Sequence, residues 1–438
     1  MASMGSVGRW AARTCALALL VSCGGHREEG GRPLAAGEDK VRAAQAPAPA
    51  LTKDSTGGPD LGALLSILAA APEGEWRRVD LNAFSDVWTP AALRPLIGGS
   101  NPDPSYIVAA WSGFAWDTKR GDLWLYGGGH GTYAGNDTYR WRGTTQRWER
   151  ASLPSQTASL GVAGRPDLFQ AVDGPDAAPT ATHTYDNNIY LPVVDRFLTF
   201  GGGVYNSGGA YARKSGSTFR DTGPYLFDPA RADGSKVGGS TGSHVQREGP
   251  YPEIVGGQMW SNRDLYGLQP ANPHLPGPHL NGMTAYAEEG GKDVVYVVAY
   301  GNGGGTDANL YRYVIHDVAA PAQDTWQRVG RYWNGIAEGG AGALDPVRRL
   351  FVRTGIAVRP FVYWDLAQAG PGNNDQFFTP TVVGDTLDFD DLTGYGMDHD
   401  PVRDAFVLWG GGGKVWQLRP PAAAGVPGVL ERLPLPTG

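Results

Sequence analysis

Short apolar stretches that end in glycine recur along this chain and give it a repeating hydrophobic and polar pattern. Each follows a turn sequence, and the stretches with their glycines occupy residues 123–129, 197–203, 297–301, 350–355 and 406–413. Three of the preceding turns, at 117–120, 345–348 and 400–403, share an aspartate in first place and an arginine in fourth place. Aspartate, and the proline that follows it in two of them, favour tight turns between strands. The pattern predicts one supersecondary unit repeated along the chain.

An aromatic segment follows each glycine run after a short loop. These segments are residues 139–141, 225–227, 310–313, 361–364 and 415–418. Two units continue into a further segment that carries a tryptophan, Trp148 or Trp326. Strands that are apolar on both faces are buried on both sides, and four short antiparallel strands per unit describe one blade of a β-propeller. The predicted fold class is therefore all-β, a propeller of four-stranded blades.

The glycine pair, the downstream tyrosine and the later tryptophan make residues 73–438 resemble the kelch-type β-propellers. The units are 74, 100, 53 and 56 residues apart, and the last two spacings match the kelch period of about 50 residues. The interval of 100 could hold a degenerate blade over residues 253–268 or only long loops. We expect five to seven blades and favour six. Residues 75–79 resemble a fourth strand, so an N-terminal strand is expected to complete a blade begun by the C-terminus.

The N-terminus has the features of a secretory signal. Arg9 and Arg13 precede an apolar run at 16–21, which is too short to span a membrane. The sequence Leu-Val-Ser-Cys that ends at Cys23 resembles the bacterial lipobox, which implies that residues 1–22 are removed and Cys23 is lipidated. Gly24, rather than aspartate, follows the cysteine, and the lipobox rule then implies the outer membrane. We expect a protein of the bacterial cell envelope that contacts the membrane only through its lipid.

A tether is expected between the lipid and the propeller. Residues 23–72 are rich in glycine, alanine and proline and poor in large apolar residues, so they cannot form a core. Within them, residues 61–71 could form a short helix that packs on the propeller. The expected organisation is a signal at 1–22, a tether at 23–72 and one propeller at 73–438.

Composition excludes several chemistries. The two cysteines, Cys15 and Cys23, lie in the signal and at the anchor, so the mature fold has no disulfide. The kelch fold is shared with galactose oxidase, whose copper-radical cofactor needs a Tyr–Cys crosslink, and that activity is excluded. A net charge of −7 without a cluster of lysine and arginine argues against nucleic acid as a partner. We expect a monomer without a cofactor, with a divalent metal as the alternative.

Three polar clusters fall where a propeller places the mouth of its central channel. His130, Tyr133 and Asn136 follow the first glycine run, whereas the other candidates are expected near the starts of innermost strands: His183, Tyr185, His279, Asn281 and Glu338. His183 and Tyr185 alternate along the expected strand, so their side chains should face the same way. Each of these residues could also have a purely structural role.

Two functions remain open at this point. A rigid scaffold with variable loops suits recognition of a carbohydrate or of a surface protein, and 14 tryptophans and 19 tyrosines suit stacking on sugars as well as blade cores. In that case His130, Tyr133, Asn136, Asn281 and Glu338 would bind the ligand. The alternative is a polysaccharide lyase, with His183, Tyr185 and His279 as catalytic acid and base. Its substrate carboxylate would be neutralised by an arginine at 213, 220 or 359. The histidines could instead hold a divalent metal.

Overall fold

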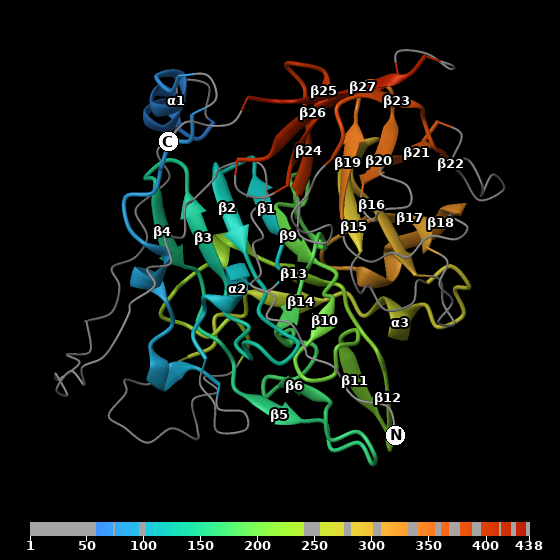
Figure 1. Cartoon of the computed structure of the whole chain (residues 1–438). Helices are drawn as coiled ribbons and strands as arrows, with labels where there is room; N and C mark the ends of the chain where they lie inside the picture. Colours follow the sequence, from blue (N-terminus) through green and yellow to red (C-terminus); the bar gives the residue numbers. More distant parts are fainter. Residues whose placement is uncertain are drawn as a thin grey trace, which may run out of the picture.

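Five antiparallel sheets form a ring of five blades, each a meander of four strands (Figure 1). The computed structural model describes residues 58–72, 75–95, 102–109, 111–240, 255–275, 282–300, 308–331, 340–354, 361–367, 377–387, 396–410, 413–421 and 426–434. The innermost strands of successive blades contact one another in the order β1, β8, β15, β19 and β24. The chain is therefore an all-β propeller, the fold class that the repeats predict.

The strands of each blade follow one another outward from the centre of the ring. Blade 1 is β1 (Phe114–Asp117), β2 (Asp122–Leu125), β3 (Tyr139–Arg142) and β4 (Arg147–Arg150); blade 2 is β8 (Asn188–Leu191), β9 (Arg196–Thr199), β13 (Tyr225–Phe227) and β14 (Trp260–Asn262); blade 3 is β15 (Met283–Glu289), β16 (Lys292–Tyr300), β17 (Ala308–Val314) and β18 (Thr325–Arg331). Blade 4 is β19 (Ala341–Asp345), β20 (Leu350–Thr354), β21 (Phe361–Asp365) and β22 (Phe377–Phe378); blade 5 is β24 (Gly396–Asp400), β25 (Ala405–Trp409), β26 (Val415–Arg419) and β27 (Gly428–Arg432). The apolar stretches before the glycines are the second strands, and the aromatic segments are the third strands, as predicted.

The remaining elements decorate this ring. The strands are the hairpin of β5 (Thr157–Ser159) and β6 (Phe169–Ala171), the pair β7 (Thr182–His183) and β10 (Gly203–Val204), the hairpin of β11 (Ala212–Ser215) and β12 (Thr218–Asp221), and β23 (Val382–Gly384), which runs parallel to β27. The helices are α1 (Gly62–Ala69), α2 (Tyr106–Ala109) and α3 (Leu265–Leu268), with 3₁₀ turns at Phe84–Val87, Ala91–Leu93, Pro229–Arg231 and Pro321–Gln323. None of the described helices is long and apolar enough to cross a membrane.

The ring has five blades, within the predicted range but not the favoured six. Within its described residues, the 100-residue interval after Gly201 carries insertions and no additional blade. One insertion is the β11–β12 hairpin between the second and third strands of blade 2. The described part of the segment expected as a degenerate blade, 255–268, supplies β14, the fourth strand of the same blade. The long spacing between the second and third repeat units, which favours six blades in the sequence, is therefore due to insertions within blade 2.

The expected closure by an N-terminal strand is wrong. Residues 75–79 form no strand, and β27 from the C-terminal segment supplies the fourth strand of blade 5. The N-terminal segment instead runs beside blade 1. Leu81 donates its backbone N–H to the carbonyl of Gln146, and the Asn82 side chain exchanges two hydrogen bonds with the backbone of Trp148 on β4. The sequence that resembled a strand therefore lies beside the outer edge of blade 1 without joining its sheet.

Apolar residues fill the spaces between neighbouring blades. Trp124 of blade 1 packs with Phe227 and Trp260 of blade 2, and similar clusters lie between blades 2 and 3, 3 and 4, and 4 and 5. The other face of blade 1 packs against the N-terminal segment, which contributes Leu64 and Phe84. Sheets buried on both faces explain why the strand sequences show apolar runs rather than alternation.

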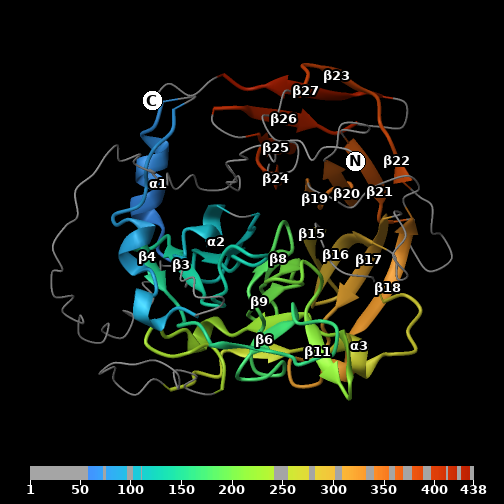
Figure 2. The same ribbon diagram turned by 60° about the horizontal axis from the view of Figure 1, so that its bottom comes forward.

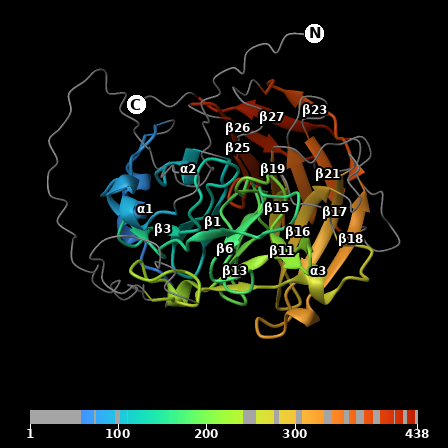
Figure 3. The same ribbon diagram turned by 90° about the horizontal axis from the view of Figure 1, so that it is seen from below.

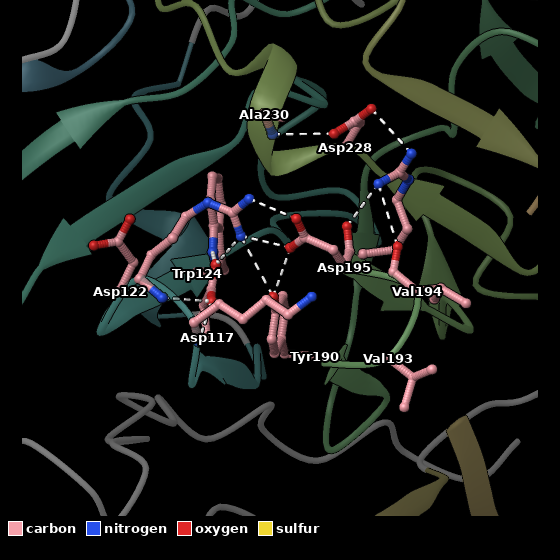
Figure 4. Close-up of polar contacts among 12 residues, drawn as sticks. Asp117, Asp122, Trp124, Tyr190, Val193, Val194, Asp195, Asp228 and Ala230 are labelled. Carbon is pink, nitrogen blue, oxygen red and sulfur yellow. Dashed lines mark hydrogen bonds and ion pairs between the residues drawn. The ribbon is translucent and has the colours of Figure 1, made fainter. Parts of the chain in front are cut away.

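Charged turns join neighbouring blades on one side of the ring, which we call the turn face. The Asp117 side chain accepts hydrogen bonds from the backbone N–H groups of Lys119 and Arg120, and closes the turn between β1 and β2. The Arg120 guanidinium then reaches blade 2, where it makes a bidentate pair with Asp195 at 2.6 and 2.8 Å. In Figure 4 the side chains of Asp117, Tyr190 and Asp195 lie close together around the guanidinium group. The turn therefore links one blade to the next.

The opposite side of the ring, which we call the loop face, carries the glycine runs of blades 1 and 2 and the longer connections between their strands. Strands of an antiparallel meander alternate in direction, so the β2–β3 and β9–β13 loops and the connection from β4 to β8 all lie on this face. The two hairpins in these connections meet, because β6 contacts β11. Figures 2 and 3 show β6 and β11 side by side near blade 2. The candidate residues at 130, 183 and 185 belong to these loops.

Candidate functional site

Four ring-bearing residues from three loop-face segments meet beside the innermost strands of blades 1 and 2. We call Trp111, His130, His183 and Tyr185 the histidine–aromatic cluster. The His183 ring is at its centre, with centroid distances of 5.0 Å to Trp111, 5.4 Å to His130 and 6.0 Å to Tyr185. His183 is buried, His130 is exposed, and the other two are partly exposed. A ligand on this face would meet three accessible rings around a buried imidazole.

The backbone of the histidine–aromatic cluster adopts an unusual conformation. Trp111, His130 and Tyr185 have φ angles of 46°, 38° and 48°, in the left-handed region that side chains other than glycine rarely occupy. Such conformations cost on the order of 1–3 kcal/mol each and concentrate at functional sites. Three of them in one group of four residues show that the fold holds these rings at an energetic cost.

The glycine runs explain how the loops can approach so closely. A Cβ atom on Gly129 would collide with the backbone of Thr182, and one on Gly202 would collide with the carbonyl of His183. Both glycines also have positive φ angles, of 30° and 153°. The runs of blades 1 and 2 thus enclose the two residues of β7 from both sides. The repeat that identifies the fold also positions His183.

His183 is held in its neutral form. Burial, with a smaller effect from the neighbouring His130, lowers the pKa of His183 to about 4. Its Nε2 atom lies 3.4 Å from the hydroxyl of Thr132, and this hydroxyl also bonds to the carbonyl of Gly129. At neutral pH the His183 imidazole therefore has one nitrogen that donates and one that accepts a hydrogen bond.

Two accessible members of the histidine–aromatic cluster, Trp111 and His130, keep polar atoms for a ligand. Within the described part of the chain, no hydrogen bond engages the indole N–H of Trp111 or the ring nitrogens of His130. Gly208 lies against His130, because a Cβ atom there would be 2.5 Å from Cε1 of the imidazole. The β9–β13 loop of blade 2 therefore supports the His130 ring from behind.

A partly buried carboxyl group, that of Asp186, follows the histidine–aromatic cluster beside the innermost strands. The Asp186 side chain accepts hydrogen bonds from the backbone N–H of Thr284 at 3.2 Å and of Gly342 at 2.9 Å, the second residues of the innermost strands of blades 3 and 4. Burial, partly offset by these bonds and reinforced by Asp398 of blade 5, raises the pKa of Asp186 to about 8. Asp186 thus ties three blades together and is largely protonated at neutral pH.

The structure brings together three of the candidates from the sequence, His130, His183 and Tyr185. Contrary to the expected alternation, His183 ends the two-residue strand β7 and Tyr185 follows in a turn, both before the innermost strand β8. Their rings are neighbours nonetheless, because the turn at Tyr185 returns its side chain toward His183.

Tyr133 and Asn136 lie in the interior. The Tyr133 hydroxyl donates to Asp137, and the Asn136 amide bonds to the carbonyl of Pro179 and the N–H of Ser155. Both side chains are buried and hold neighbouring segments together. The other candidates lie outside the described residues: His279, Asn281, Glu338 and Cys23.

Two of the three arginines considered for a substrate carboxylate already have acidic partners. Arg213 and Arg220 both bind Asp264, at 2.9 and 2.6 Å, and Arg213 also pairs with Asp176. Arg359 lies outside the described residues. These pairs brace the β11–β12 hairpin against the connection that follows β14.

Within the described residues, one group could offer three ligands to a metal, and it lies on the turn face. Asp345, His399 and Asp404 bring their ligand atoms within 4.8 Å of one another. The Arg348 guanidinium bonds to both carboxylates, at 2.7 Å to Asp345 and 2.5 and 2.7 Å to Asp404. The Arg348 guanidinium therefore already neutralises both carboxylates.

Sequence reasoning missed Trp111 and Asp186. Trp111 precedes the first strand of blade 1 with no repeat around it, and its role depends on a left-handed backbone that the sequence does not reveal. Asp186 lies in a polar stretch, between Tyr185 and Asn187, in which the histidine and the tyrosine are the more evident acid and base candidates.

Comparison with known proteins finds similarity at the level of structure. No protein-family model and no curated protein sequence matches the chain. Among solved structures it is similar to a mutant of the α-L-arabinofuranosidase arb93a from Fusarium graminearum bound to an iminosugar inhibitor, with a TM-score of 0.34 and 11% identity over 73% of this chain and 79% of that chain. It is also similar to the Dos1 propeller, with a TM-score of 0.29 and 8% identity over 74% and 83% of the two chains.

Proposed function

We propose that this chain recognises carbohydrate on the loop face of its propeller, at the histidine–aromatic cluster. The observation that carries the proposal is the meeting of Trp111, His130 and Tyr185 around the buried His183, with left-handed backbone at the three accessible residues. A structural core would not need three such residues at its exposed edge. A binding site, which must hold side chains in one orientation before the ligand arrives, accounts for this cost.

The chemistry of these side chains suits a sugar. A pyranose ring presents C–H groups on its faces and hydroxyls around its rim. Aromatic rings provide apolar faces for the C–H groups, and the edges of tryptophan, tyrosine and histidine provide hydrogen-bond donors and acceptors for the hydroxyls. The indole N–H of Trp111 and the His130 nitrogens are the groups that would bond to the rim.

The proposal extends to the family and location of the protein. The glycine pairs, tyrosines and tryptophans of the repeat support a kelch-type propeller, and the lipobox-like sequence ending at Cys23 supports a lipoprotein of the bacterial outer membrane. Replacing Cys23 with serine should move the protein from the membrane fraction to the soluble fraction. Retention of the variant in the membrane fraction would contradict the lipid anchor.

Glycan binding is testable with the full chain carrying Cys23→Ala, which removes the lipid site. We expect this protein to bind members of a glycan array and expect Trp111→Ala to weaken that binding at least tenfold in calorimetric titrations. Trp76→Ala is the matched control, because Trp76 is an exposed tryptophan of the N-terminal segment. Absence of binding to every glycan, or equal binding by the Trp111 variant and the control, would refute the proposal.

One observation favours catalysis as a second candidate. The neutral His183 imidazole beside the Tyr185 ring is a suitable pair for proton abstraction, because an imidazole with a lowered pKa is unprotonated at neutral pH. A polysaccharide lyase would use this pair as base and acid. Release of unsaturated sugar from a uronic-acid polymer, followed by ultraviolet absorbance and abolished by His183→Ala, would establish the lyase.

A further inference from the structure

Helix α1 is apolar on all sides but is covered on only one of them. Ser66 is the single polar side chain in residues 61–72, and its hydroxyl donates to a backbone carbonyl of the same helix at 2.7 Å. Leu64 is buried against blade 1, whereas Leu65 and Leu68 are exposed. A helix on a protein surface normally carries polar residues on its outer side, and a helix that is apolar all round is normally buried. The outer side of α1 therefore lacks the cover that such a surface normally has.

The helix lies on the turn face of the ring. Leu61, which precedes α1, lies against Gly121 in the β1–β2 turn and against Gly143 in the β3–β4 turn. Figure 1 shows α1 at the opposite end of the molecule from the β5–β6 and β11–β12 hairpins of the loop face. The exposed leucines of α1 and the histidine–aromatic cluster therefore lie on opposite faces of the propeller.

Further apolar side chains are exposed on the turn face. Val347 and Val402 occupy the third position of the Asp-Pro-Val-Arg turns of blades 4 and 5, and they are 75% and 90% exposed. Leu81 is also exposed, and it donates its backbone N–H to Gln146 in the β3–β4 turn of blade 1. Apolar side chains that share one exposed face are typical of a surface that contacts a membrane or a partner. We call the following five the apolar turn-face residues: Leu65, Leu68, Leu81, Val347 and Val402.

The course of the N-terminal segment indicates that a lipid bilayer covers these residues. The proposed lipid anchor is Cys23, and Gly58, 35 residues further along the chain, leads directly into α1. That length of chain spans at most about 120 Å even when fully extended, so the anchor keeps the turn face near the bilayer. A second and weaker contact with the bilayer then becomes intramolecular, which favours it strongly. Leucines on the apolar side of a surface helix are suited to such a contact, because they bury at the boundary between lipid headgroups and acyl chains.

We propose that the apolar turn-face residues bind the surface of a phospholipid bilayer and that the loop face is directed away from it. This inference rests on the lipid anchor of the proposed function, because the lipid brings α1 to the bilayer. It adds a second membrane contact to that of the lipid, which the sequence predicts as the only one. Contact through one face fixes the orientation of the propeller, so the histidine–aromatic cluster is presented to ligands on the side away from the bilayer.

The test measures which face of the propeller contacts lipid. Removal of residues 1–22 and lipidation of Cys23 leave no natural free thiol, so an introduced cysteine is the single labelling site. Ser66→Cys in α1 and Ser217→Cys in the β11–β12 hairpin place the same fluorescent label at an exposed serine on each face. The lipidated full chain is reconstituted in vesicles of phosphatidylethanolamine and phosphatidylglycerol that contain a quencher attached to the acyl chains. We expect lipid quenching of the label in α1 to be at least twofold stronger than that of the label in the hairpin.

Substitutions distinguish an apolar contact from simple proximity to the bilayer. The double variant Leu65→Gln/Leu68→Gln removes apolar surface and keeps good helix formers, so it should reduce the quenching in α1 to the level of the hairpin. Leu268→Gln is the matched control and should change nothing, because Leu268 of α3 is 45% exposed, against 43% for Leu68, and follows β14 on the loop face. Raising NaCl from 50 to 500 mM should also leave the quenching unchanged, whereas a contact held by charge would weaken.

Equal quenching on the two faces, stronger quenching in the hairpin, or quenching in α1 that the double variant leaves unchanged or that salt abolishes would overturn the inference. A label in α1 that is shielded from iodide in the water but is not quenched from the lipid would show that protein, such as a second copy of this chain, covers the surface, and would overturn it as well. Sedimentation of the vesicles before the quenching measurement tests the anchor separately. A chain that does not sediment with the vesicles would refute the proposed lipid anchor, and the inference with it, whereas glycan binding by the Cys23→Ala chain is measured independently of either result.

Discussion

Replacing Arg120 with methionine tests whether turn-face ion pairs hold neighbouring blades together. The Arg120 guanidinium bonds to Asp117 of its own turn at 2.9 Å and to both carboxylate oxygens of Asp195 in blade 2 (Figure 4). The Tyr190 hydroxyl completes the group by donating to Asp195 at 2.6 Å. Methionine keeps most of the apolar stem and removes the charge, so the change isolates the ion pair from the packing.

The expected loss can be worked out from both partners. Removing one member of a buried ion pair typically costs about 3–5 kcal/mol, because the remaining charge is left buried. Asp117 is fully buried and Asp195 is 28% exposed, so a value of about 3 kcal/mol, at the lower end of that range, applies. Burial opposes ionisation of Asp195, but the hydrogen bonds from Arg120 and Tyr190 outweigh it and lower the pKa of Asp195 to about 2. That lowering corresponds to about 2 kcal/mol, which Arg120 shares with Tyr190 and which does not include the contact of Arg120 with Asp117, so it accounts for only part of the first value.

The chain supplies its own control for this experiment. Arg403 occupies the same place in the Asp-Pro-Val-Arg turn of blade 5, but its side chain is 67% exposed and pairs with Asp400 of its own turn. Exposed pairs contribute about 0–1 kcal/mol, so Arg403→Met should cost less than about 0.5 kcal/mol. Urea unfolding of the full Cys23→Ala chain at pH 7, followed by tryptophan fluorescence, measures both. Equal losses for the two variants, or a loss below 1 kcal/mol for Arg120→Met, would refute the reasoning.

Three further predictions concern stability. Asp122 is fully buried. Burial raises its pKa to about 7, because it outweighs the opposite effect of the positive charges of Arg140 and Arg142. Because the unfolded chain releases this proton near pH 4, the native state loses stability as pH rises from about 4 to 7. The free energy of unfolding of Asp122→Asn, measured relative to the parent by urea titration, should therefore rise by at least about 1 kcal/mol between pH 4.5 and pH 8. A difference between the two proteins that does not change with pH would contradict this. Gly202→Ala should lower the melting temperature and weaken glycan binding together, because the added Cβ meets the His183 carbonyl; unchanged melting and binding would contradict this. Phe84→Ala, which removes a buried ring 5.0 Å from that of Tyr139, should cost about 3 kcal/mol in urea unfolding, and a loss below 1 kcal/mol would contradict its role.

The repeat could be predicted from the sequence because each strand type carries its own chemistry. The second strands are apolar stretches followed by glycine in the sequence, and the third strands are aromatic; both assignments are confirmed in all five blades. The blade number could not be predicted in the same way. Spacing alone does not distinguish a blade from an insertion within one, and blade 2 contains the β11–β12 hairpin between its second and third strands.

The candidate site could be predicted only in part, for a related reason. His130, His183 and Tyr185 were found because they stand at the ends of repeats, where propellers expose their loops. The conformations that bring them together were not predictable, since nothing in the residue types indicates φ angles of 38° and 48° at histidine and tyrosine. Trp111 joins them through its ring contact with His183 and through the hydrogen bond from the Tyr185 N–H to its carbonyl, a contact between residues 74 positions apart.

The junction between the last and first blades explains why the expected N-terminal strand does not form. Arg348 of blade 4 donates to Asp404 of blade 5. The residue of blade 1 that corresponds to Asp404, and that could accept from Arg403 of blade 5, is Gly121, which has no side chain to accept a hydrogen bond. The Leu61 side chain lies directly against Gly121 instead.

The N-terminal segment continues this cover across blade 1. Leu64, Val79 and Phe84 pack on the face of blade 1 that is turned away from blade 2. A strand at 75–79 would have joined the edge of blade 5 and left this apolar face of blade 1 uncovered. The N-terminal segment thus completes the propeller by covering a face rather than by extending a sheet.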